Sequence, residues 1–213
     1  MRFAPLEGLD AEQREQLAAL TFESARSPFP EWLPDLAAAR EEIDDALAKI
    51  AQVPHAGERA NSAHAVGRVL VDDDGGLVAW GAVEHSWGGV WELHPLLVSV
   101  AHQRKSHGRV LVTELERLAA EQGAVTLFLG TSDAVGATSI GGVDLYDDPR
   151  GVLGALAAIS TKLPEGHAYR FWQRCGFVIV GVIPDGDAIG VPSIQLAKRI
   201  ARAGVRAAAP TGR

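Results

Sequence analysis

The sequence is poor in cysteine, in long hydrophobic runs and in positive charge. Its 213 residues include one cysteine, Cys175, which permits no intrachain disulfide and excludes a metal site built from several cysteines. No apolar run approaches the roughly 18 residues that a membrane-spanning helix needs. Acidic residues precede any apolar stretch at the N-terminus, so no signal peptide is expected. These absences together predict a cytoplasmic protein that is not bound to a membrane.

The charge balance is acidic, with 20 Lys and Arg against 27 Asp and Glu and a formal net charge of −7. A nucleic-acid-binding protein normally carries the opposite sign, so no nucleic-acid partner is expected. An acidic surface favours a cationic partner, because a negative cleft concentrates positive ligands. The alternative interpretation is that the acidity serves solubility alone.

Hydropathy patterning predicts an α+β domain. Apolar spacing indicates helices at 10–24, 35–50, 108–122, 150–160 and 166–175. Alternating or continuous apolar runs indicate strands at 65–71, 77–85, 90–100, 124–130, 177–183 and 193–198, with the strand at 124–130 buried on both faces. This order predicts one domain over residues 1–200 around a mixed sheet, with a loop at 51–64 and a flexible tail at 201–213. Regular alternation of strand and helix with a glycine fingerprint, as in a doubly wound nucleotide-binding fold, is absent.

A polar turn at residues 103–109 joins a predicted strand to a predicted helix. The free backbone N–H groups and the dipole at such a helix start form an anion site. Arg104, Lys105 and Arg109 add positive charge within an otherwise acidic chain. The turn therefore predicts a site for a pyrophosphate, with a plain solvated loop as the alternative.

Several sequence blocks resemble a known family. Residues 103–108 (QRKSHG) resemble the acyl-CoA pyrophosphate loop of the GCN5-related N-acetyltransferases (GNAT), and residues 170–177 (RFWQRCGF) resemble their late helix and strand. The match is closer to one branch, the aminoglycoside 6′-N-acetyltransferases. Four blocks carry it, in the family's order: WELHPLLV (91–98), LGTSDAVGATSIGGVDLY (129–146), YRFWQRCGF (169–177), and VGVIPD with GVPSIQLAKRI (180–200).

The resemblance implies a fold and a set of binding residues. The expected fold is a mixed, mostly antiparallel sheet flanked by helices and splayed between its fourth and fifth strands, with acetyl-CoA as co-substrate in the opening. Asp133 and Asp144 match acidic positions of the family and are expected to bind ammonium groups of a cationic aminoglycoside. Similar enzymes are often homodimers. The backbone around the opening would hold acetyl-CoA, through Leu96, Leu97, Val98, Gln103, Arg104, Lys105, Ser106, His107, Gly108 and Arg109.

Glu92 is the candidate catalytic base. An amine must lose its proton to attack a thioester, and a carboxylate near the end of an apolar strand can accept it. Glu92 is the only carboxylate between Val90 and Val100, and similar enzymes have a glutamate there. His94 lies two residues further, on the same side of the strand, where it could bind substrate, relay a proton or simply pack. The histidines show no recognised ligand spacing, so no metal is expected.

Two residues depart from the family pattern. Ser106 occupies the place of the first glycine in the pyrophosphate loop, where a positive φ would disfavour serine. Trp172 occupies the place of a tyrosine that is usually proposed to protonate the departing thiolate. Indole is not an acid at neutral pH, so either Tyr169, one helical turn earlier, takes this role or the thiolate leaves without a dedicated acid.

The expected function is acetyl-CoA-dependent acetylation of the 6′-amine of aminoglycoside antibiotics, by direct transfer, as in a resistance enzyme. One alternative is a GNAT enzyme that acetylates another amine, such as a polyamine, a metabolite or a protein N-terminus. The other alternative is a non-catalytic sensor that binds CoA.

Overall fold

The computed structural model describes residues 1–26, 32–52, 65–147, 151–164 and 166–200. Most of the loop expected at 51–64 and the whole tail expected at 201–213 lie outside these residues. Within them, no helix is both long enough and apolar enough to cross a bilayer.

A seven-stranded mixed sheet organises the chain, in the order β1-β2-β3-β4-β5-β7-β6. Every neighbouring pair is antiparallel except β4 and β5, which are parallel. Hydropathy alone missed β1, a four-residue strand that pairs with β2. The strands are β1 (Arg2–Pro5), β2 (Ala65–Val71), β3 (Leu77–Trp87), β4 (Val90–Val98), β5 (Thr126–Ser132), β6 (Val178–Ala188) and β7 (Val191–Arg199).

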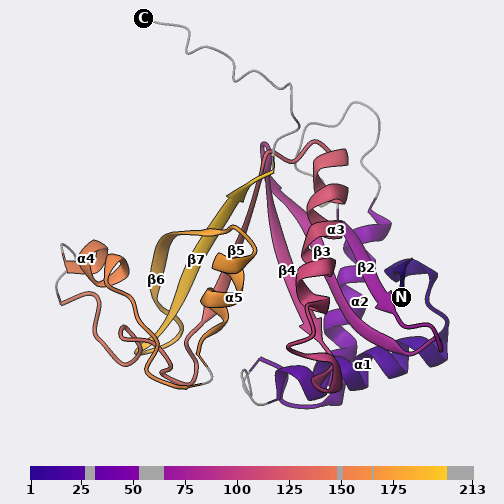
Figure 1. Ribbon diagram of the computed structural model, residues 1–213, viewed down its shortest axis with the longest axis horizontal. Coiled ribbons are helices and arrows are strands. Elements are labelled where there is room, and N and C mark those ends of the chain that lie inside the picture. The colour runs from indigo at the N-terminus through magenta and orange to yellow at the C-terminus, as the bar shows by residue number, and fades with distance from the viewer. Residues whose placement is uncertain (27–31, 53–64, 148–150, 165, 201–213) are drawn as a thin grey trace, which may run out of the picture.

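The sheet opens between β4 and β5, as the family resemblance implied. Residues 90–92 pair with residues 126–128, and no later pair joins the two strands. Beyond Glu92 the strands diverge, and Figure 1 shows β1 to β4 and β5 to β7 as two wings that meet at one end. The edge of β4 from Leu93 onward is thus left without a strand partner on the β5 side. This confirms the predicted α+β fold, splayed between the fourth and fifth strands.

Helices cover both faces of the first wing. One hydrophobic cluster packs α1 (Ala11–Ala25) and α2 (Leu36–Ala51) against one face, where the indole of Trp80 donates a hydrogen bond to Thr21 Oγ1 over 2.8 Å. A second cluster packs α3 (His107–Glu121) on the opposite face and continues into α5 (Ala168–Arg174) of the second wing. The short helix α4 (Gly151–Ala157) contacts β6 at the far edge.

The expectation that both faces of the strand at 124–130 are buried was wrong. In β5, Leu127, Leu129 and Thr131 are buried, whereas Phe128 is half-buried and Gly130 is exposed. The hydrophobic cluster around α3 and α5 covers only the face that carries Leu127 and Leu129. Phe128 turns the other way and contacts the ring of the exposed Trp87 (5.4 Å between centroids).

Candidate active site

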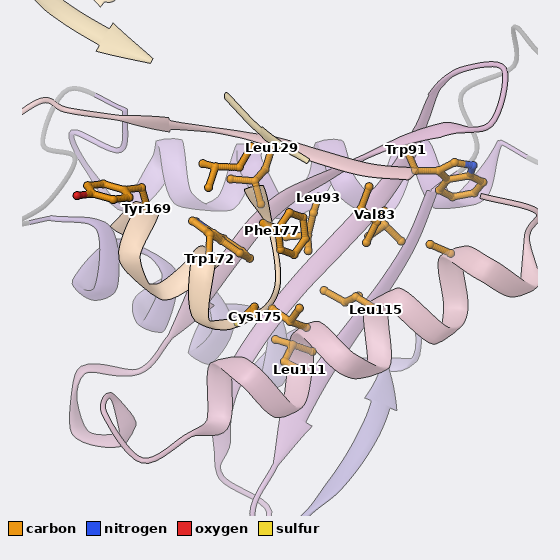
Figure 2. Packing of buried hydrophobic residues seen from close by; sticks show 14 of the residues in the cluster. Val83, Trp91, Leu93, Leu111, Leu115, Leu129, Tyr169, Trp172, Cys175 and Phe177 are labelled. Atoms are coloured by element: carbon orange, nitrogen blue, oxygen red, sulfur yellow. The ribbon is translucent and has the colours of Figure 1, made fainter. Parts of the chain in front are cut away.

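Strand β4 directs its side chains alternately to the two faces of the first wing. Trp91 and Leu93 enter the core beneath α3, with Leu115 of that helix close by (Figure 2). Glu92 and His94 therefore project from the opposite face, toward α2. A bulge follows, because Leu93 is opposite Val83 and Leu96 is opposite Gly81, which leaves one extra residue on β4.

Acidic and basic side chains from three elements meet on the α2 side of β4. Glu84 of β3 is the direct cross-strand neighbour of Glu92. The ammonium group of Lys49, from α2, lies 2.6 Å from Glu84 Oε2, and His94 Nε2 lies 3.2 Å from Glu42 Oε1. Glu42, Lys49, Glu84 and His94 also line a small cavity of about 100 Å³. We call these four residues together with Glu92 the acidic cluster.

Glu92 is the unpaired carboxylate of the acidic cluster. It forms no hydrogen bond or ion pair with any residue that the structure describes, and it is half-buried. Burial raises the pKa of Glu92, and the negative charge of Glu84 raises it further, while His94 and Lys49 act in the opposite direction. A carboxylate with a raised pKa and no partner is a better proton acceptor than an ordinary exposed glutamate.

The pKa of His94 is shifted by its neighbours. Burial acts to lower it, but the hydrogen bond and charge of Glu42 overcome this effect, with help from Glu92 and Glu84, so that the pKa lies above its ordinary value. Among the described residues Glu42 is the only hydrogen-bond partner of His94, and 46% of the His94 side chain is exposed. The imidazolium form is thereby favoured at this position.

The predicted pyrophosphate loop follows β4 after a short 3-10 turn at Val100–His102. Gln103 Nε2 donates a hydrogen bond to the carbonyl of Val98 over 3.1 Å, which fixes the loop to the strand. Arg104 has φ of 62° and Ser106 has φ of 69°, both in the left-handed region. Ser106 is the N-cap of α3 but makes no side-chain capping bond. The first N–H groups of this 15-residue helix are therefore not capped by Ser106, and exposed Arg104 and Lys105 precede them, as an anion site requires.

Gly108 allows α3 and α5 to approach each other closely. A Cβ atom at this position would lie 3.2 Å from the ring of Phe171 and 3.4 Å from Val98 Cγ2. His107 precedes it as the first residue of α3, and exposed Arg109 follows. Glycine is needed here for packing at the opening, in addition to any backbone contact with a phosphate.

The two acidic residues predicted to bind the acceptor lie in different environments. Asp133 is only 1% exposed, and its carboxylate accepts hydrogen bonds from Ala137 N (2.6 Å), Thr138 N (3.1 Å) and Thr138 Oγ1 (2.6 Å). Asp133 thus holds the loop after β5, and its contact with the acceptor stays a prediction. Asp144 is exposed, and it accepts a hydrogen bond from Tyr146 N over 2.9 Å, so it remains open to a ligand.

A model of the acetyltransferase (GNAT) family matches residues 21–151, which is more than half of the chain. The chain belongs to this family. A comparison with curated proteins gives no match.

Several solved structures are similar to this GNAT chain. An aminoglycoside 6′-N-acetyltransferase complexed with coenzyme A is 27% identical with a TM-score of 0.74, and the alignment covers 94% of this chain and 97% of the other. The aminoglycoside 6′-N-acetyltransferase from Enterococcus faecium is 26% identical with a TM-score of 0.71 at the same coverage. An aminoglycoside 6′-acetyltransferase type Ii, 24% identical with a TM-score of 0.60, shares the fold.

At the position where many GNAT enzymes have a late-helix tyrosine, this chain has a core residue. Trp172 is 8% exposed, and its ring packs edge-on against Phe177 (Figure 2) and against Phe171. Tyr169, on the preceding turn, is fully buried, and its hydroxyl has no hydrogen-bond partner among the described residues. No described contact assigns a proton-donating role to either residue.

Sequence reasoning missed Glu42, Lys49 and Glu84 of the acidic cluster. A signal for Glu42 was present, because it lies three residues after Ala39 and four before Ala46, both on the buried face of α2. A carboxylate at helical spacing from two buried alanines is expected to face the core. The ring of Trp32, just before α2, lies 5.2 Å from the ring of His94.

Proposed function

We propose that this GNAT enzyme transfers the acetyl group of acetyl-CoA directly to the 6′-amine of an aminoglycoside, with Glu92 as general base. The observation that carries the proposal is the state of Glu92: a half-buried carboxylate without a partner among the described residues, on β4 where the sheet opens. The other glutamates of the acidic cluster are each bound to a cation and are less suited to accept a proton.

The opening between β4 and β5 is the expected site of acetyl-CoA, which supplies a thioester-activated acetyl group. The unpaired edge of β4 at Leu96, Leu97 and Val98 offers backbone groups to an extended pantetheine arm. The N–H groups at the start of α3, which no side chain of Ser106 caps, offer a site for the pyrophosphate together with Arg104, Lys105 and Arg109.

In the proposed reaction the amine nitrogen bonds to the acetyl carbon and the carbon–sulfur bond breaks. Glu92 accepts the proton that the amine loses, directly or through a water molecule, and the thiolate of CoA departs and takes up a proton from solvent. Aligning amine and thioester at the opening supplies much of the remaining acceleration.

The acceptor class follows from charge and from the family neighbours. The acidic cluster and the exposed carboxylate of Asp144 present negative charge to a polycationic ligand. Two neighbours at 26–27% identity are aminoglycoside 6′-N-acetyltransferases and align over 94% of this chain. Both lines of support favour an aminoglycoside over a peptide or a neutral metabolite.

A comparison of neomycin and paromomycin tests the proposal. Neomycin has a 6′-amine and paromomycin has a 6′-hydroxyl, while their other amines are shared. With acetyl-CoA present, thiol release is expected to be rapid with neomycin and slight with paromomycin, which should act as a competitive inhibitor. Equal turnover of both would show that another amine is acetylated. Turnover of a polyamine or peptide with neither antibiotic accepted would refute the aminoglycoside assignment.

A further inference from the structure

His94 is held between two residues that come from outside the sheet. Glu42 Oε1, from α2, lies 3.2 Å from His94 Nε2. The ring of Trp32, just before α2, lies 5.2 Å from the imidazole ring, tilted by 50°. One side of His94 is thus fixed by a carboxylate and another by an aromatic ring, and neither contact involves Glu92.

Glu42 is itself fixed in place. Its side chain is only 18% exposed, because its neighbours Ala39, Ile43 and Ala46 are buried against the sheet. The indole of Trp32 acts on Glu42 as well, and together with His94 it lowers the pKa of that carboxyl against the effect of burial. A largely buried carboxylate is costly unless it is paired and hydrogen-bonded, and these two residues meet that requirement.

We propose that Glu42 is a positioning residue of the active site, which holds the imidazole of His94 in a fixed orientation beside Glu92. The inference rests on the proposed function, in which Glu92 receives the proton of the acceptor amine. Glu42 acts through His94 and is not required to touch the acceptor or acetyl-CoA.

The consequence for Glu92 is electrostatic. Burial and the facing Glu84 favour the protonated form of Glu92, and a protonated glutamate cannot act as a base. The positive charge of His94 opposes both effects and lowers the pKa of Glu92 relative to what burial and Glu84 alone would give. Glu42 stabilises the imidazolium of His94 and in this way affects Glu92 indirectly.

The test replaces Glu42 with glutamine, which keeps the size and the carbonyl acceptor but removes the charge. Glu41→Gln is the matched control, because it makes the same change one residue away on the exposed side of α2. The titration of His94 is followed by NMR on the free protein, with its signals assigned from their loss in His94→Gln. The midpoint is expected to move to lower pH in Glu42→Gln and to stay in place in Glu41→Gln. An unchanged midpoint in folded Glu42→Gln would overturn the inference.

The rate provides a second readout. For Glu42→Gln we expect kcat/KM for the best amine acceptor to fall about 10- to 100-fold near neutral pH, as for a misplaced group in a catalytic site. The groups that face His94 are Glu42, Asp45 and Lys49 of α2, Glu84 of β3 and Glu92 of β4. Between the His94 midpoint of Glu42→Gln and that of the wild type, His94 is neutral in the variant and charged in the wild type. The deficit should therefore be largest in that pH interval. A deficit equal at every pH would indicate a purely structural role and would contradict the proposal.

Failure of this inference can be told apart from failure of the proposed function. The His94 titration needs neither acceptor nor acetyl-CoA, so it decides the role of Glu42 even if no aminoglycoside is acetylated. If Glu42→Gln does not fold, Glu42→Asp replaces it in the test. Aspartate keeps the charge but moves the carboxylate away from His94 by one methylene group. A partial shift of the His94 midpoint in Glu42→Asp would support the proposal, and no shift would overturn it.

Discussion

Replacing Glu92 with glutamine tests the base most directly. Glutamine preserves the shape and the hydrogen-bonding capacity of the side chain but cannot accept a proton. It also removes the like-charge contact with Glu84 across the strands, so the fold is not expected to suffer. Any loss of rate in a folded variant then reports on proton transfer.

The size of the loss follows from what else lies on the α2 side of β4. The other glutamates of the acidic cluster are already paired, since Glu42 is bound to His94 and Glu84 to Lys49. The carboxylate of Asp45 lines the same cavity, but it belongs to the exposed side of α2 and not to β4. We therefore expect kcat/KM to fall by about 10³-fold, within the roughly 10²–10⁴-fold range of a lost general base. At about 1.4 kcal/mol for each factor of ten, this corresponds to roughly 4 kcal/mol of transition-state stabilisation.

The assay is thiol release with neomycin and saturating acetyl-CoA between pH 6 and 9, with Glu41→Gln as the control. The deficit of Glu92→Gln should shrink as the pH rises, because a growing share of the amine is already deprotonated and needs no base. A deficit that stays constant across this range would indicate that Glu92 binds the acceptor. Wild-type activity in the variant at neutral pH would refute the reasoning altogether.

Two further predictions concern the loops around the opening. Ser106→Gly removes a side chain from a left-handed backbone position and should raise the free energy of unfolding by roughly 1 kcal/mol in urea titrations. A free energy of unfolding below that of the wild type would show that the serine side chain stabilises the loop. Asp133→Asn should lower that free energy by about 1.5–3 kcal/mol, the usual value of hydrogen bonds to a charged group, whereas unchanged stability with a raised KM for the acceptor would support its predicted role in binding.

Much of the fold could be predicted, because long apolar patterns determine it. The helix expected at 35–50 is α2 at Leu36–Ala51, and the helix expected at 108–122 is α3 at His107–Glu121. The end of strand β6 was harder to predict, since the strand extends to Ala188 whereas its apolar run ends at Ile183. The last residues lie at an exposed hairpin end, where Asp185 and Gly186 carry no hydrophobic signal. Strand β1 was missed because its four residues are identified by pairing with β2 and not by pattern.

The site could be predicted only where its residues lie close together in sequence. Glu92 and His94 share a strand, so their common face follows from alternation alone. Glu42 reaches His94 from 52 positions earlier in the chain, and that contact exists only once α2 packs on the sheet. A carboxylate in a predicted loop, such as Asp133, is expected from the sequence to be solvated. In the structure Asp133 is buried and accepts hydrogen bonds from the turn that follows it. Charge in sequence thus predicted a cationic ligand, while packing decided which carboxylates are paired and that Glu92 has no partner among the described residues.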